Sequence, residues 1–353
     1  MTNREIIDAL HVRQTLSFDA WVQLIRTRTE DDCAYAAQLA RTLAQQRFGK
    51  QIYFRGVIEF TNYCKNDCYY CGIRHGNTCA ARYRLTQGDI LACCEDGYAH
   101  GFRTFVLQGG EDPYFTDERL VAMVSAIRAR FADCAITLSV GERSRASYQR
   151  LFDAGANRYL LRHETADAAH YAQLHPTDML WAHRMQCLRD LKDIGYQTGC
   201  GFMVGTPHQT AEHLAADMVF IGAFRPQMIG AGPFIPHRDT PFRDAPAGSV
   251  ALSLFLLSLC RIAQPEVLLP ATTALGTVCG DGRQLGVLAG CNVVMPNLSP
   301  LSVRKKYMLY NDKVGTDDSA ADGVRALTQQ MEAIGYTVHV GRGDYKKEDM
   351  PHD

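Results

Sequence analysis

The sequence predicts an α/β fold, a (β/α)8 TIM-type barrel with an N-terminal helical extension. Short apolar runs alternate with longer amphipathic stretches after Gly49, the pattern of parallel strands linked by helices. Most runs are continuously apolar, as expected for strands that are buried on both faces. No repeat, low-complexity tract or linker divides the 353 residues, a length that suits one large barrel.

The elements follow in chain order. Residues 1–50 have apolar side chains at helical spacing and predict N-terminal helices. The barrel is expected over residues 51–310. A C-terminal extension over residues 311–353 is expected to pack on it, with a polar end from Lys346 that frays. The eight predicted strands are Val57–Phe60, Thr104–Gln108, Ile136–Ser139, Arg158–Leu161, Gly199–Val204, Met228–Ala231, Val267–Ala271 and Asn292–Met295. The main predicted helices between them are Asp117–Phe131, Ser144–Ala154, Trp181–Gly195, Thr210–Ala223 and Ser249–Ala263. A partial barrel of six strands fits the same pattern.

Composition restricts the function classes. Lys and Arg (37) balance Asp and Glu (38), which argues against binding of nucleic acid or anionic membranes. The most apolar stretch, Ser249–Cys260, is short and interrupted by serines, so it predicts a buried helix rather than a membrane span. The start of the chain shows no secretory signal. Thirteen cysteines in such a chain therefore favour the reducing cytoplasm, where thiols bind metal or pack in the core.

Three cysteines directly follow the first predicted strand. Cys64, Cys68 and Cys71 have the spacing C-x3-C-x2-C. Three thiolates on one loop can hold a [4Fe–4S] cluster and leave its fourth iron open. That iron could bind the amino and carboxylate groups of S-adenosylmethionine, while Tyr70 packs against the adenine. Two other interpretations are a zinc site completed by His75 or Cys79, and a group of buried cysteines without a ligand.

Polar residues stand where the barrel should place its active site, at the carboxyl ends of the strands. Gln108–Glu111 follow the second predicted strand, Ser139 and Glu142 the third, Arg162–Glu164 the fourth, and Thr272–Thr273 the seventh. The glycines of Gly109-Gly110-Glu111 allow close backbone approach to a ligand, and the carboxylate can offset an ammonium group.

The cysteine triplet with its aromatic residue, together with the Gly-Gly-Glu loop, resembles the radical S-adenosylmethionine superfamily. This resemblance implies a [4Fe–4S] cluster and S-adenosylmethionine as cofactors, and reductive cleavage of S-adenosylmethionine to a 5′-deoxyadenosyl radical. Longer segments resemble one branch, the HydE maturases of [FeFe]-hydrogenase. These segments are Val57–Arg74, Val106–Tyr114, Tyr159–Thr165, Gly232–Pro241, Pro270–Thr277 and Asn292–Asn297.

The HydE resemblance implies a small organometallic substrate, an iron–carbonyl–cyanide–cysteinate synthon on the way to the diiron subcluster of hydrogenase. A reductant of the flavodoxin or ferredoxin type and other hydrogenase maturases are the implied partners. The residues implied to bind S-adenosylmethionine are Tyr70, Gly109, Gly110, Glu111, Ser139, Glu164 and Arg184. The residues implied to line the substrate cavity are Gln108, Arg162, Met228, Thr272, Thr273, Met295 and Tyr310.

Structural roles compete with several of these assignments. Methionines at strand ends are often core residues, Arg162 could pair with Glu164, and Thr272 could cap the next helix. His163 is equally expected as a buried, hydrogen-bonding side chain. The cysteines in or near predicted helices are expected in the core, namely Cys93, Cys94, Cys134, Cys187 and Cys260.

One departure from the family concerns a second cluster. Some HydE proteins carry three further cysteines near the carboxyl end, but Lys313–Val324 contains none here. An auxiliary cluster is therefore not expected in that stretch.

Three other functions remain open on sequence. One is a mutase similar to methylornithine synthase. Another is a sulfur-insertion enzyme similar to biotin synthase, in which Cys134, Cys200 and Cys291 would serve a second cluster. The third is a non-catalytic iron–sulfur carrier or scaffold, which needs an exposed cluster and no S-adenosylmethionine site.

Overall fold

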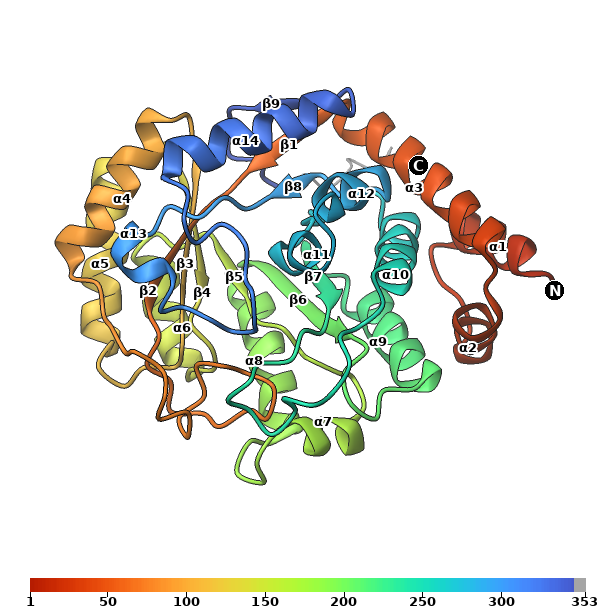
Figure 1. The fold of residues 1–353 in the computed structure, drawn as a ribbon, viewed down its shortest axis with the longest axis horizontal. Helices are drawn as coiled ribbons and strands as arrows, with labels where there is room; N and C mark the ends of the chain where they lie inside the picture. The colour runs from red at the N-terminus through yellow and green to blue at the C-terminus, as the bar shows by residue number, and fades with distance from the viewer. Residues whose placement is uncertain (346–353) are drawn as a thin grey trace.

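The computed structural model describes residues 1–345; residues 346–353, with the predicted frayed end from Lys346, lie outside the described residues. Its centre is a parallel sheet of six strands in the order β2-β3-β4-β5-β6-β7 (Figure 1). Because each strand runs parallel to the next, helices make the crossovers and cover the outside of the sheet. The strands are β2 (Gly56–Thr61), β3 (Thr104–Gly109), β4 (Ala135–Ser139), β5 (Arg158–Leu160), β6 (Gln197–Val204) and β7 (Met228–Pro233).

The crossover helices have sequence-encoded starts. Thr86, Ser144, Thr210 and Ser249 each accept a hydrogen bond from the first turn of the helix they precede. The helices of this layer are α4 (Gln87–Ala99), α5 (Asp117–Arg130), α6 (Arg145–Asp153), α7 (Ala168–Leu174), α8 (Trp181–Ile194), α9 (Ala211–Phe224), α10 (Val250–Ala263), α11 (Thr273–Val278) and α12 (Gly282–Leu288).

Three helices precede the sheet, namely α1 (Asn3–Arg13), α2 (Phe18–Thr27) and α3 (Glu30–Phe48). They lie at one edge of the molecule, with α3 against α10 and α2 against α9 (Figure 1). Trp21 and Leu24 are buried there, so the apolar spacing seen in the sequence is used for packing.

A second parallel sheet has the order β8-β1-β9, with β1 (Gln51–Phe54), β8 (Val293–Val294) and β9 (Thr337–His339). Single bridges join Met228 to Leu268, Pro270 to Val293, and Val57 to Asn297. Backbone pairing therefore runs from β7 through two irregular segments to β2, in a parallel α/β fold of the TIM type.

The seventh predicted strand, Val267–Ala271, is present only as two isolated bridges. Pro270 has no N–H to donate, which interrupts a ladder at this place. Strands β1 and β9 were not expected. Only Arg55 separates β1 from β2, and β9 joins the sheet from almost 300 residues further along the chain.

The C-terminal part covers the amino-terminal end of the strands. The guanidinium of Arg158 donates to the Arg342 carbonyl and pairs with Asp344, both at 2.7 Å. Thr104 donates to the same carbonyl at 2.9 Å. These contacts pack the C-terminal part against the starts of β3 and β5. Helices α13 (Leu301–Arg304) and α14 (Ala320–Ala333) lead to β9, and the division into residues 1–50, 51–310 and 311–353 stays a prediction.

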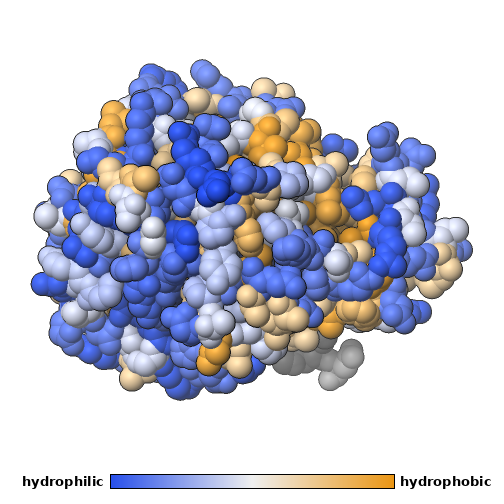
Figure 2. All heavy atoms as spheres, turned by 60° about the horizontal axis from the view of Figure 1, so that its bottom comes forward, coloured by the Kyte–Doolittle hydropathy of each residue, from blue (hydrophilic) through white to orange (hydrophobic). Residues whose placement is uncertain are grey.

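One face of the molecule is mainly polar (Figure 2). Figure 2 shows a face that is mostly hydrophilic, with hydrophobic residues gathered toward its upper right. Within residues 1–345, no helix combines the length and the apolar character needed to cross a membrane.

Candidate active site

A cavity of about 600 Å³ opens at the carboxyl ends of the central strands. Its size suits a cofactor together with a small substrate. All but one of the residues assigned from the sequence to the cluster, to the cofactor or to the substrate contribute to its wall. They are Cys64, Cys68, Tyr70, Cys71, Gln108, Gly109, Gly110, Glu111, Ser139, Arg162, Glu164, Arg184, Thr272, Thr273, Met295 and Tyr310.

Met228 is the exception, because it does not line this cavity. It is the first residue of β7, at the amino-terminal end of the strand, where it packs with Leu268 and Val293 in a buried cluster. The cavity instead takes Gly230 and Gly232–Ile235 from the same chain segment. The competing view of Met228 as a core residue is therefore the one that fits.

The three cysteines lie on the long loop after β2. Arg82 fixes this loop from within, donating to the carbonyls of Ile73 at 2.9 Å, Arg74 at 2.6 Å and Asn77 at 3.0 Å. The thiols are free, partly buried, and face the cavity. One rigid loop thus presents three metal-binding groups to the same space.

The donor set fits an iron–sulfur cluster better than zinc. At least one pair of the three sulfurs is more than 4.8 Å apart, whereas one tetrahedral zinc would need about 3.8 Å between every pair. Wider spacing suits a cubane, whose thiolates bind different irons. His75 and Cys79, the possible fourth zinc ligands, are exposed and do not line the cavity.

The raised pKa values of the thiols also indicate that a cation is needed to keep them deprotonated. Burial, followed by the neighbouring Cys64, raises the pKa of Cys71 to about 12. Burial and the other two cysteines raise the pKa of Cys68 as well. Thiolates at these positions therefore need positive charge beside them, which the irons of a cluster supply.

Tyr70 is held in place by a buried histidine. Its hydroxyl lies 3.0 Å from Nε2 of His175, whose Nδ1 lies 3.0 Å from the Tyr171 carbonyl. Since a carbonyl only accepts, Nδ1 carries the proton, and Nε2 accepts from Tyr70. Burial lowers the pKa of His175 to about 4, which keeps the ring neutral. The chain segment that includes α7 thus fixes the aromatic wall next to the cluster loop.

Two glycines let the Gly-Gly-Glu loop pack against its neighbours. A Cβ on Gly110 would lie 2.2 Å from the Tyr63 carbonyl oxygen, so only glycine fits against the cysteine loop. Gly141 has φ +77°, and a Cβ there would lie 2.0 Å from the Glu111 side chain. Glu111 accepts from the Glu142 amide at 2.9 Å, which orients its carboxylate.

Asp112 braces the same loop. Arg84 Nε donates to it at 2.6 Å, and the Thr61 hydroxyl donates at 2.7 Å. Burial would raise the pKa of Asp112, but Arg84 and Thr61 hold it below the usual value of 3.8. The carboxylate is therefore a charged anchor between β2 and the loop after β3.

Two ion pairs involve the cavity residues Arg184, Arg162 and Glu164. Arg184 Nε lies 2.7 Å from Glu142 Oε1, and Arg162 lies 2.9 Å from Glu164. Glu164 has φ +66°, a conformation that costs about 1–3 kcal/mol in a residue with a side chain. The predicted Arg162–Glu164 pairing is present, and both residues still face the cavity.

Of the remaining residues that the sequence singled out, Thr272 has a structural role as a helix cap. Thr272 caps α11, its hydroxyl accepting from the Leu275 amide at 3.4 Å, and it also lines the cavity. Gln108 donates to the Tyr307 hydroxyl at 3.4 Å. His163 is fully buried and lies 3.2 Å from Asp217, as expected for a hydrogen-bonded core histidine.

Sequence reasoning missed a charged pair in the cavity wall. Lys313 forms a buried ion pair with Glu59 of β2, and Asn297 donates to the other Glu59 oxygen at 2.9 Å. Glu59 could have been noticed as an acid within an apolar strand, but Lys313 carries no local signal. Both residues line the cavity, together with Tyr307 and Arg283.

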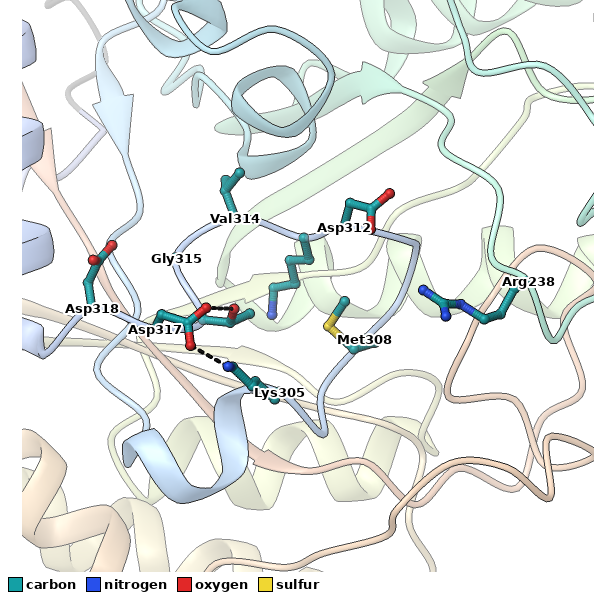
Figure 3. A pocket seen from close by; sticks show the side chains of 10 residues that line it. Arg238, Lys305, Met308, Asp312, Val314, Gly315, Asp317 and Asp318 are labelled. Carbon is teal, nitrogen blue, oxygen red and sulfur yellow. Dashed lines mark hydrogen bonds and ion pairs between the residues drawn. The ribbon is translucent and has the colours of Figure 1, made fainter.

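Lys313 belongs to the cysteine-free stretch of the C-terminal part. A shallow pocket occupies the outer side of this segment, where Lys305 pairs with Asp317 at 2.5 Å (Figure 3). Val314 and Gly315 line both this pocket and the main cavity. The segment is thus a wall of the cavity.

Within residues 1–345, no cysteine other than Cys64, Cys68 and Cys71 lines the cavity. Cys134, Cys200 and Cys291 are buried, and none of the three lines it. Cys93, Cys94, Cys187 and Cys260 are also buried, as expected for core residues. Nothing within residues 1–345 therefore offers the cysteine ligands that a second cluster in the cavity would need.

Comparisons with known proteins agree with this geometry. The sequence model of the Radical SAM superfamily matches residues 58–221. The [FeFe] hydrogenase maturase subunit HydE of Thermotoga maritima is 37% identical over 336 residues, which cover 95% of each chain. The 3-methylornithine synthase of Methanosarcina barkeri is 27% identical over 298 residues, covering 84% of this chain and 83% of that protein.

Solved structures share the architecture. A crystal structure of methylornithine synthase (PylB) matches with a TM-score of 0.82 at 24% identity, covering 95% of this chain and 97% of the other. A crystal structure of HydG, a maturase of the [FeFe]-hydrogenase, matches with a TM-score of 0.80 at 18% identity, covering 96% and 76%. At these identities the two matches concern the fold alone.

Proposed function

The chain belongs to the HydE family of the radical S-adenosylmethionine superfamily, and from this premise we propose that it matures [FeFe]-hydrogenase. It is a radical S-adenosylmethionine enzyme, and its cofactors are a [4Fe–4S] cluster and S-adenosylmethionine. The observation that carries the proposal is the 37% identity with HydE over nearly the whole chain. When bound, the cluster supplies the electron that cleaves S-adenosylmethionine.

The protein's own side chains have separable tasks in this proposal. Cys64, Cys68 and Cys71 hold the cluster. Tyr70, kept in place by His175, offers a flat wall to adenine. The Glu111 carboxylate offsets the cofactor's ammonium group, and Arg184 offers donors to its carboxylate.

The substrate is proposed to occupy the half of the cavity toward Arg162, Thr273 and Tyr310. An iron–carbonyl–cyanide–cysteinate complex carries a carboxylate and cyanide nitrogens, which accept hydrogen bonds from these donors. Backbone pairing from β7 round to β2 favours a closed eight-stranded barrel, which would keep bulk water from a radical. The reductant is proposed to be of the flavodoxin or ferredoxin type, and the thirteen free cysteines favour a cytoplasmic location.

The alternatives receive less support. The 27% identity with 3-methylornithine synthase is lower and covers less of the chain. A second cluster of the biotin-synthase type would need further cysteines in the cavity wall. Within residues 1–345, Cys134, Cys200 and Cys291 are buried and do not line the cavity. A carrier or scaffold would not need the Gly109–Glu111 loop or an enclosed cavity.

The proposal is tested by a maturation assay. Anaerobically reconstituted and reduced protein is incubated with S-adenosylmethionine, apo-hydrogenase and the other maturases, and hydrogenase activity and 5′-deoxyadenosine are measured. We expect hydrogenase activity and 5′-deoxyadenosine with the unchanged chain. We expect the same with Cys79→Ala, which alters an exposed cysteine on the loop that carries the three cluster cysteines. Cys68→Ala should give neither. Release of 5′-deoxyadenosine without hydrogenase activation would overturn the assignment.

A further inference from the structure

A second group of metal-binding side chains lies behind the cavity wall. Atoms of Glu142, His183 and Cys187 all lie within 4.8 Å of one another. His183 and Cys187 are four residues apart on α8 and so share one helix face. Glu142 reaches them from the turn after β4. None of the three lines the cavity.

The distances within this group match those of a zinc coordination shell. Nε2 of His183 lies 3.4 Å from Oε2 of Glu142 and 3.7 Å from Sγ of Cys187. Tetrahedral zinc, with bonds of about 2.0 Å to nitrogen or oxygen and 2.3 Å to sulfur, separates such ligands by about 3.3 and 3.5 Å. For these two pairs the side chains would need to move by only a few tenths of an ångström, and the third pair, Glu142 and Cys187, lies within 4.8 Å.

The surroundings also suit a bound cation. The side chain of His183 is 57% exposed, which leaves a path for entry and room for a water ligand, whereas Cys187 is 1% exposed. The second oxygen of Glu142 lies 2.7 Å from Arg184 Nε, the kind of outer partner that orients a metal-binding carboxylate. One carboxylate and one thiolate would neutralise a divalent ion.

We propose that Glu142 Oε2, His183 Nε2 and Cys187 Sγ bind one divalent cation of the zinc type, with water in the fourth position. The Cys187 thiol releases its proton to solvent as the metal–sulfur bond forms. Glu142 then bridges the ion and Arg184, so the site stiffens the wall that presents this arginine. This site does not depend on the proposed role in hydrogenase maturation.

The test uses full-length protein with its iron–sulfur cluster in place, so that Cys64, Cys68 and Cys71 are occupied. One equivalent of Zn²⁺ is added, loosely held metal is removed, and retained zinc is measured by mass spectrometry. X-ray absorption at the zinc edge then reports the ligands. We expect about one zinc per chain, with one sulfur near 2.3 Å and lighter ligands near 2.0 Å.

His183→Ala is the decisive variant because its exposed side chain can be removed without opening the core. It should weaken zinc retention at least about tenfold. His11→Ala, which removes an exposed histidine from α1, should retain zinc fully. Absence of retained zinc in the unchanged chain, equal retention in His183→Ala, or a shell of three sulfurs from the cluster loop would each overturn the proposal.

Discussion

The hydroxyl of Tyr70 donates to Nε2 of His175 across 3.0 Å, joining the cysteine loop to the segment after α7. A second link runs from the Tyr69 amide to the Leu174 carbonyl at 3.0 Å. The aromatic ring beside the third cluster cysteine is thus fixed by residues more than 100 positions away. In this protein, the position of the aromatic ring that we propose for adenine binding is a tertiary feature rather than a property of the motif alone.

His175→Ala should therefore weaken binding of S-adenosylmethionine about tenfold, because loss of one buried hydrogen bond costs about 1.4 kcal/mol. Binding is measured by equilibrium dialysis on cluster-loaded protein, with iron content as a check that the cluster is intact. Tyr70→Phe keeps the ring but removes the donor, so it should give a similar loss. The double variant should be no worse than either single one. Additive losses would show that the two residues act separately.

Gly110→Ala should destabilise the protein by about 1–3 kcal/mol, since its Cβ would overlap the Tyr63 carbonyl and the two loops would have to separate. Urea unfolding measures the free energy of unfolding, and iron analysis measures how much iron the protein incorporates. Both values should fall in Gly110→Ala. Gly222→Ala is the matched control. It lies within α9 with nothing within 4 Å of the added Cβ, and it should stabilise by about 0.5–1 kcal/mol. Unchanged iron incorporation in Gly110→Ala would contradict the close packing of the two loops.

Arg162→Ala should spare cleavage of S-adenosylmethionine in the absence of substrate but lower hydrogenase activation at least about tenfold. The reason is that Arg162 faces the cavity with donors suited to the substrate, while the cofactor wall remains. Release of 5′-deoxyadenosine and the maturation assay separate the two effects. Arg162→Lys keeps the charge without the planar fork and should give an intermediate result. Normal activation by Arg162→Ala would remove this residue from the substrate site.

Acid should destabilise the protein through His170. Burial, followed by the neighbouring His213, lowers the pKa of His170 from 6.5 to about 4. Between these values the unfolded chain binds a proton that the folded chain does not, so stability falls as the pH drops from about 6.5 toward 4. Between pH 7 and pH 5 this side chain should account for a loss of about 2 kcal/mol. Urea unfolding of His170→Gln at pH 7 and pH 5 should show a correspondingly smaller loss of unfolding free energy between the two pH values. A loss equal to that of the unchanged chain would contradict a neutral His170.

The sequence alone determined much of this protein. The three cysteines, the Gly-Gly-Glu loop and Arg162–Glu164 were identified from the sequence. In each case the chemically informative residues stand close together in a short segment directly after a predicted strand. In a parallel sheet every such segment emerges at the same edge, so strand order is not needed to gather them. The amphipathic periods likewise located the main helices, because burial of one face is a local pattern.

Only the tertiary structure decided the rest. It showed that Met228 packs against Leu268 and Val293 in a buried cluster and does not line the cavity. It brought Lys313 to Glu59 across 254 positions, and His175 to Tyr70 across 105. It also gathered Glu142, His183 and Cys187 behind the cavity wall. Such contacts depend on how distant elements pack, and no spacing within a short segment of the chain encodes them.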